Sequence, residues 1–376
     1  MTEVIKANTD ADFLAMVPAV IGYHAQNSLV CVAFSGKSTC GGFRLDLPQR
    51  RRNSDYRLIA NHVVGMLSRM SGATRVAPII YTDATFEKEN GVPWVAFARY
   101  LEERLLADGF SIASVLCVAK DAWGNYADLE HLREGRPLDD IENSAMSKNP
   151  LVRKAPKLDE WMTLPTVTER QIRQFRGHTL AMVRGRINGF EELLDLDQVD
   201  FVERTAESAS LSFAEATMLL LYAQSPARRD EMMLQAAFGE LTGRAVVADS
   251  EHYHRLQRQS GQSMDEVVQT EMQAGRHSEL GGLIMGEGTM RPTVERVERM
   301  IVHLKQICAL AEPDTLPPVY CMLAWLLWSR GLGSAAGHFV DRALDIDPEY
   351  GMALVLYSLF ASGRLPEWAF ASGVRR

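Results

Sequence analysis

The feature that most constrains the fold of this chain is a change in the spacing of its apolar residues after about one third of its length. In the first part, short β-favouring runs alternate with segments whose apolar residues recur every three or four positions. Strands are predicted at 28–34, 43–47, 75–82, 112–119 and 122–129, and helices at 9–22, 54–71 and 93–108. From Thr166 onward almost every segment has helical spacing. Two differently built domains are therefore expected.

The predicted fold class is α+β or α/β. Residues 1–132 are expected to form an α/β domain whose sheet is mixed, because the first two strands form a hairpin over 35–42 while the later ones are joined by helices. Residues 133–165 contain several prolines and no clear period, and are interpreted as a linker or extended arm. Residues 166–376 are expected to be all-helical.

Near the end of the chain, residues 320–348 have the spacing of two helices that pack closely. Small residues at Ala336 and Ala343 are expected at the helix contact, Gly331 at the turn, and Asp347-Pro348 at the stop. This pattern resembles one tetratricopeptide repeat, with 320–362 as the tetratricopeptide-like unit. The unit is either a hairpin that ends a bundle or a partner-binding groove. Candidate partner-binding residues are the aromatics Tyr320, Trp325, Trp328 and Tyr357.

Composition excludes several classes of protein. The net charge of -8 argues against a protein that binds nucleic acid mainly through charge. Five cysteines with no CxxC pair argue against a disulfide framework or a zinc site, and no metal or cofactor is predicted. The opening residues lack the apolar stretch of a signal peptide, and the run Cys321–Trp328 is far shorter than the roughly 20 residues of a membrane span. A cytoplasmic location without membrane association is expected.

No complete catalytic motif is present. Gly36-Lys37-Ser38-Thr39 is the tail of a phosphate-binding loop, but Cys31 stands where that motif needs glycine and a strand follows where it needs a helix. A hairpin turn is therefore predicted. The run Arg50–Arg52 is interpreted as a solvated loop, with contact to a phosphate-rich partner as the alternative. Enzymatic activity is left open.

Several segments resemble one family, in the same order along the chain. They are Val17-Pro18, Gly22-Tyr23 and Asn27-Ser28-Leu29-Val30, then Phe43–Pro48, Ala227–Asp230, and Ala324-Trp325 with Asp347-Pro348. These segments are similar to an actinobacterial family known as a domain of unknown function, DUF4192. Relatives often carry a cysteine-rich stretch after a Trp-containing strand, whereas 127–137 here has no cysteine. The resemblance implies a fold and a cytoplasmic location, and no mechanism.

Two groups of residues are candidates for binding a small molecule. The first lies in the segment 18–28, where Gly22 and Asn27 also suit a helix end and a turn. The second follows a predicted strand, where α/β proteins place ligand-binding groups. The candidates are His24, Asn27, Ser28 and Asp83.

Two functions follow from these observations. The first is a noncatalytic binding or scaffold protein, whose C-terminal helices contact a protein partner. The alternative is an enzyme or sensor that binds a small molecule at the edge of the N-terminal sheet. Nucleic acid is the least expected partner, because of the net charge.

Overall fold

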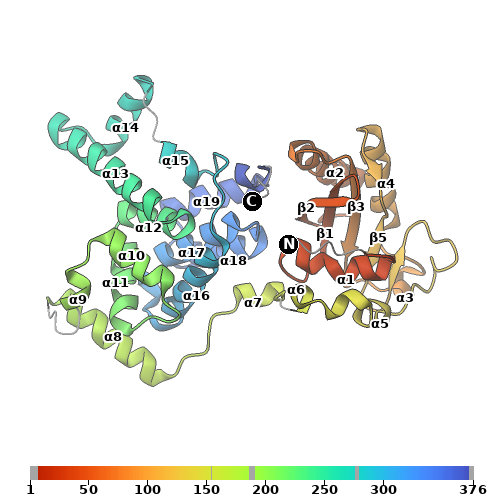
Figure 1. Ribbon diagram of the computed structural model, residues 1–376, viewed down its shortest axis with the longest axis horizontal. Helices are drawn as coiled ribbons and strands as arrows, with labels where there is room; N and C mark the ends of the chain where they lie inside the picture. Colours follow the sequence, from red (N-terminus) through yellow and green to blue (C-terminus); the bar gives the residue numbers. More distant parts are fainter. Residues whose placement is uncertain (1–6, 154, 186–190, 276–278, 372–376) are drawn as a thin grey trace. The chain divides into compact units, whose positions relative to one another are not determined.

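The computed structural model describes residues 7–153, 155–185, 191–275 and 279–371 (Figure 1). They form two compact units. The N-terminal unit contains the described residues up to Trp161, together with Phe370 and Ala371, and the helical unit contains Met162–Ala369. The expected order, a mixed sheet with helices followed by a helical region, is confirmed.

The N-terminal unit is built on one mixed sheet. Its strands are β1 (Ser28–Ser35), β2 (Ser38–Asp46), β3 (Arg75–Tyr81), β4 (Ser111–Ile112), β5 (Leu116–Val118) and β6 (Trp123–Asn125). The order is β2-β1-β3-β5-β6, and β4 pairs with the start of β3. β1 is antiparallel to β2 and β3, whereas β3 and β5 are parallel. β2, β3 and β5 therefore run the same way, and their C-terminal ends share one side of the sheet, here called the carboxyl edge.

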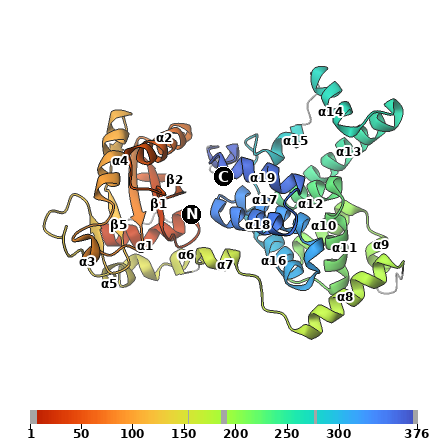
Figure 2. The same cartoon turned by 180° about the vertical axis from the view of Figure 1, so that it is seen from behind.

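Helices cover both faces of this sheet (Figures 1 and 2). α1 (Asp10–Ile21) packs on one face, where its residues Leu14 and Val17 meet Val30 and Val32 of β1. α2 (Asn53–Arg69) and α4 (Val95–Ala107) pack together over the other face. Two adjacent glycines of β2 face opposite sides of the sheet. A side chain at Gly42 would meet α1, and one at Gly41 would meet Met70 just after α2.

The hairpin expected after β1 is present and is tighter than predicted. Only Gly36 and Lys37 separate β1 from β2, with Gly36 at φ 61°. The left-handed backbone that a two-residue hairpin requires is easily adopted by glycine. Because a strand follows this turn, the phosphate-binding alternative for Gly36–Thr39 has no helix N-terminus to use.

The strand predicted at 112–119 is divided into β4 and β5. The chain leaves the ladder between them, where the Ser114 hydroxyl donates to the Asp10 carboxylate at 3.2 Å. This side-chain hydrogen bond joins the interruption to the start of α1. A short helix that was not predicted, α3 (Phe86–Glu89), follows β3.

Much of the segment expected to be a linker belongs to the N-terminal unit. It forms α5 (Asp139–Glu142), η1 (Ala145–Lys148), α6 (Pro150–Arg153) and α7 (Leu158–Met162). The first three pack against α1, and Leu138 and Ile141 join the core on that face of the sheet. These apolar residues have no regular period, so the sequence did not reveal their burial. The boundary between the units lies at Trp161 rather than over the whole of 133–165.

The helical unit contains no strand among its described residues. Its helices are α8 (Glu169–Val183), α9 (Glu191–Leu194), α10 (Gln198–Glu207), α11 (Phe213–Ala223), α12 (Pro226–Phe238), α13 (Glu240–Ser260), α14 (Met264–Gln273), α15 (Glu279–Ile284), α16 (Val294–Leu310), η2 (Pro313–Thr315), α17 (Pro317–Ser329), α18 (Gly333–Ile346), α19 (Gly351–Ala361) and η3 (Glu367–Ala369). Ser212 with Glu215 and Ser263 with Glu266 have the three-residue spacing of a capping box, and both boxes are formed. α17 is buried along its whole length and forms the centre of the unit.

α17 and α18 form a closely packed helical hairpin, joined through Gly331 at φ 83°. Tyr320 and Phe339 stack across it with ring centroids 5.8 Å apart. Ala336 and Ala343 have no exposed surface, which agrees with their expected place at the contact. Among the described residues, no helix is both long and apolar enough to cross a membrane.

Candidate functional site

Two residues predicted from the sequence meet at the carboxyl edge. Asn27 precedes β1 and Asp83 follows β3, and these strand ends are neighbours because Ser28 pairs with Tyr81. The Asn27 side-chain amide donates to Asp83 Oδ2, and its Oδ1 accepts the Asp83 backbone N–H at 2.8 Å. Asn27 has a φ of 42°, a left-handed conformation that asparagine tolerates better than most residues. The pair therefore ties the two strand ends together, while Asp83 itself remains exposed.

Trp94 is the most unusual residue at this edge. It precedes α4 with a φ of 62°, a left-handed backbone that is rare for a bulky side chain and costs about 1–3 kcal/mol. Its indole N–H donates to the Thr82 hydroxyl at 3.2 Å, beside Asp83 at the end of β3. The ring is half-buried. The fold thus holds Trp94 in a strained conformation that places an aromatic surface at the carboxyl edge.

Arg51 covers the Trp94 ring, with its guanidinium carbon 4.5 Å from the ring centroid. The same guanidinium donates to both oxygens of Glu89, at 2.7 and 2.8 Å. This pairing lowers the pKa of Glu89, chiefly through the hydrogen bonds from Arg51. Glu89 therefore neutralises the charge of Arg51 and orients its guanidinium over the Trp94 ring. Arg51 holds that ring in place and is not a free charge for a ligand.

Asp121, which follows β5, has its carboxylate occupied by backbone. Its two oxygens accept the N–H groups of Phe86 and Glu87 at 3.0 and 3.3 Å, which anchors the start of α3. The neighbouring Lys120 backbone N–H donates to the Ala84 carbonyl at 3.2 Å. These bonds hold the loops after β3 and β5 together and leave the Lys120 side chain exposed.

The unpaired charges at this edge are mostly positive. Four exposed cations have no ion pair within the described residues: Arg50, Arg52, Lys88 and Lys120. Glu89 and Asp121 are already engaged, which leaves Asp83, the exposed Glu87, and Asp55 in the first turn of α2 as the opposing acids. α2 and α4 also begin at this edge, and neither has a side-chain cap on its first N–H groups. Such groups favour a negative partner.

The other two predicted ligand candidates are placed differently. Ser28 is fully buried and its hydroxyl has no hydrogen-bond partner in the structure, so it is not presented to a ligand. Its side chain has the same parity as Val30 and Val32, which face α1. His24 lies at the surface, and its backbone N–H donates to the Pro156 carbonyl at 2.9 Å. Partial desolvation, followed by the nearby Lys157 ammonium, lowers the pKa of its imidazole.

Three of the four candidate partner-binding aromatics are interior residues of the helical unit, so their side chains are not presented at its surface. Tyr320, Trp325 and Trp328 have exposed fractions of 2%, 0% and 1%. The Trp325 and Trp328 indoles donate to the Ile284 and Arg364 carbonyls. They are buried because α17 is surrounded by other helices, a placement that helical periodicity alone cannot reveal. Tyr357, on α19, is the exception, at 53% exposed.

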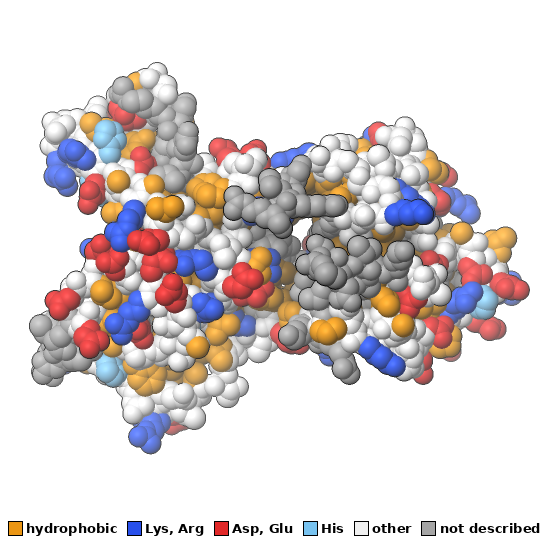
Figure 3. Space-filling model, in the orientation of Figure 1, with side chains coloured by type: hydrophobic (Ala, Val, Ile, Leu, Met, Phe, Trp, Pro, Cys, Tyr) orange, Lys and Arg blue, Asp and Glu red, His pale blue; other side chains and the backbone are white. Residues whose placement is uncertain are grey.

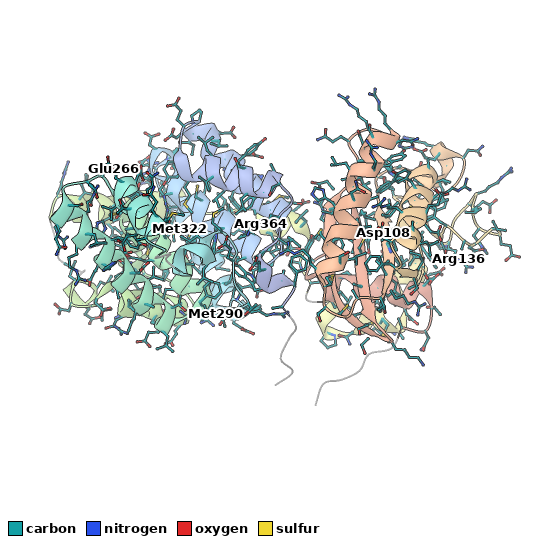
Figure 4. All side chains as sticks on the ribbon, turned by 90° about the horizontal axis from the view of Figure 1, so that it is seen from above. Asp108, Arg136, Glu266, Met290, Met322 and Arg364 are labelled. Carbon is teal, nitrogen blue, oxygen red and sulfur yellow. The ribbon has the colours of Figure 1, made fainter. Side chains whose placement is uncertain are left out.

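One cluster with the side chains of a metal site occurs among the described residues. Ligand atoms of Asp128, Glu130 and His131 lie within 4.8 Å of one another in the loop after β6. Asp128 is already paired with Arg136 at 2.8 Å and with His131 at 3.1 Å (Arg136 is labelled in Figure 4). A guanidinium on the same carboxylate opposes the binding of a cation. This cluster is therefore best described as an exposed ion-pair network.

Sequence reasoning missed Thr82, Glu89, Trp94 and Asp121, and treated Arg51 only as part of a basic run. One signal was available for Asp121, because it follows a strand as Asp83 does. No signal was available for Trp94, because its left-handed backbone depends on how the loop after α3 closes.

The chain belongs to the family described as Domain of unknown function (DUF4192). The family model matches residues 11–149 and 195–367, which include the carboxyl edge and most of the helical unit. No curated protein and no solved structure matches the chain.

Proposed function

We propose that the N-terminal unit is a noncatalytic binding module that holds a small anionic ligand at the carboxyl edge of its sheet. The observation that carries the proposal is Trp94, whose strained backbone keeps a half-buried aromatic ring there. Backbone strain of this kind persists where the surrounding structure enforces it, and it clusters at binding sites. Arg51 and Thr82 supply that enforcement.

The charges beside Trp94 support an anion rather than a cation. Arg50 and Arg52 lie where α2 begins, and Lys120 lies beyond β5, all exposed. Arginine suits phosphate and carboxylate groups because its planar donors bind two oxygens at once. The uncapped first turn of α4 adds N–H donors of the same polarity, whereas the first turn of α2 already contains the Asp55 carboxylate.

The other function considered, a scaffold whose partner lies in a groove along 320–362, has lost most of its support. Three of its four aromatic contacts are in the core of the helical unit. The resemblance of 320–348 to one tetratricopeptide repeat then describes how the hairpin packs, rather than a binding groove.

A ligand screen tests the proposal. The full chain is screened by thermal unfolding against inorganic phosphate, nucleotides, sugar phosphates and dicarboxylates, and the best compound is measured by calorimetry. Arg52→Glu reverses a free charge at the edge and is expected to weaken binding about tenfold or more, or 1.4 kcal/mol.

Lys37→Glu is the matched control. Lys37 is an exposed cation in the turn at the far end of β1, so its reversal changes the net charge equally without touching the edge. Affinity should stay at the wild-type value. Equal loss of affinity in both variants would indicate general electrostatic attraction. If none of the tested classes of anion stabilises the protein, the proposal is contradicted.

A further inference from the structure

Glu89 occupies, from within the chain, a position at the carboxyl edge that suits an anionic ligand. Its two carboxylate oxygens accept hydrogen bonds from Arg51 at 2.7 and 2.8 Å, and the guanidinium lies over the Trp94 ring. Arginine binds the carboxylate or phosphate group of a ligand through the same two-point arrangement. The side chains of Arg51 and Glu89 are 44% and 31% exposed. A ligand therefore reaches this pair without any change in the core of the unit.

The Glu89 carboxylate is exchangeable because little else depends on it. Among the described residues, its side chain forms hydrogen bonds with Arg51 alone. The backbone of α3 is held separately, since Asp121 accepts the N–H groups at its start and the Glu89 N–H donates to the Thr85 carbonyl at 3.1 Å. An ion pair between exposed groups adds little net stability. Rotation of the Glu89 side chain is therefore sufficient to release Arg51, and the loop does not have to open.

The charges next to this pair favour a ligand with more than one negative charge. Arg50 and Arg52 flank Arg51 in the chain, and both are exposed and without an ion pair within the described residues. On the face of the N-terminal unit that Figure 3 shows, acidic and basic side chains are mixed, and the net charge of the chain is -8. Attraction of an anion therefore depends on local cations such as this run of three arginines, of which Glu89 neutralises one.

We propose that Glu89 is an internal competitor that selects a phosphate group over a carboxylate, an inference that rests on the proposed anion site. A free carboxylate makes the same two hydrogen bonds with Arg51 as Glu89 does, but Glu89 is tethered beside Arg51 by the chain and so has the higher effective concentration. A phosphate monoester carries about −1.5 to −2 charges at pH 7 and has three acceptor oxygens. Two of these oxygens replace those of Glu89, and the third is left for Arg50 or Arg52.

Calorimetric titration of the full chain with phenyl phosphate and with benzoate tests this selection, because the two probes share a ring and differ in the anionic group. The wild type should bind phenyl phosphate at least about tenfold more tightly than benzoate. Glu89→Gln removes the competitor and should bind each probe about fivefold more tightly than the wild type does. In the double variant Arg51→Gln/Glu89→Gln this gain should be absent, because it depends on the release of Arg51.

Glu87→Gln is the matched control. Glu87 is an exposed acid on the same helix, α3, so its replacement removes an equal charge without releasing Arg51. Its affinities should stay within about twofold of the wild type, because salt screens the effect of an exposed charge. Equal affinities in Glu89→Gln and Glu87→Gln would overturn the inference and leave the anion site standing, as would wild-type binding of benzoate as tight as that of phenyl phosphate. If neither probe binds to any of these proteins, the inference is overturned as well, and the ligand screen decides on the anion site.

Discussion

The contact between α17 and α18 predicts that a larger side chain at position 343 destabilises the helical unit. Ala336, Phe339, Val340 and Ala343 lie on one face of α18, and none of them has any exposed surface. The stacked rings of Tyr320 and Phe339 show that this face meets α17 directly. Ala343→Leu adds three carbon atoms where two backbones approach closely.

The expected cost is about 1–3 kcal/mol, the usual penalty for extra volume in a close-packed core. The helix propensities of alanine and leucine differ by only a few tenths of a kcal/mol, so propensity does not decide the result. For a unit of this size, each kcal/mol lowers the melting temperature by about 2–4 °C. Denaturant unfolding followed by far-UV circular dichroism measures the change, with an unchanged slope as evidence that the same unit unfolds.

The control has to be an exposed alanine in a helix of the same unit. Ala335, at the start of α18, is not suitable, because it is as buried as its neighbours, at 0% exposed. Ala245 on α13 is exposed, and Ala245→Leu should change the free energy of unfolding by no more than about 0.5 kcal/mol. If Ala343→Leu has the same unfolding midpoint as Ala245→Leu and the wild type, the packing argument for this hairpin is refuted.

Three further predictions concern pH, the boundary between the units, and the Asn27–Asp83 pair. Burial lowers the pKa of His303, whose Nε2 contacts the Ser208 carbonyl at 3.1 Å while Nδ1 has no hydrogen-bond partner in the structure. The contribution of His303 to stability should therefore be full above the unfolded pKa of about 6.5 and should fall as the pH drops below it. His303→Gln should reduce this pH dependence of the free energy of unfolding, and an unchanged pH dependence would contradict the assignment. Limited proteolysis should cut 163–168, the stretch without helix between α7 and α8, before 139–161, and early cuts within α5 or α6 would contradict the packing of that segment on α1. Asn27→Ala should destabilise the N-terminal unit more than Asn27→Gly does, because both lose the Asp83 hydrogen bonds but only alanine is strained at φ 42°; equal midpoints would show that the strain is absent.

Local signals in the sequence were sufficient for most secondary structure. Thr9 and Gly22, at the ends of the helix predicted over 9–22, cap α1, and the capping boxes at Ser212 and Ser263 form because they need only residues three positions apart. The mixed sheet followed from one hairpin and later helical crossovers. These inferences depend on interactions between residues that are close together in the sequence, so the sequence alone is sufficient to predict them.

Features set by distant contacts were missed. The short helices of 139–153 are held by Leu138 and Ile141 against α1, although the segment has no apolar period. The burial of the partner-binding candidates Tyr320, Trp325 and Trp328 was not apparent, because a single helix gives no information on how many neighbours surround it. At the carboxyl edge, Asn27 and Asp83 could be named from strand ends, whereas Trp94 depends on the closure of a loop over Thr82 and Arg51.

Fluorine NMR of the full chain labelled with 5-fluorotryptophan tests the anion site most directly. The chain has six tryptophans, and comparison with Trp94→Phe assigns the Trp94 resonance. If the carboxyl edge is the binding site, the anion that best stabilises the protein shifts the Trp94 resonance in a saturable way. The resonances of Trp325 and Trp328, buried in the helical unit, stay in place. A saturable shift of another tryptophan while Trp94 is unchanged would contradict the account.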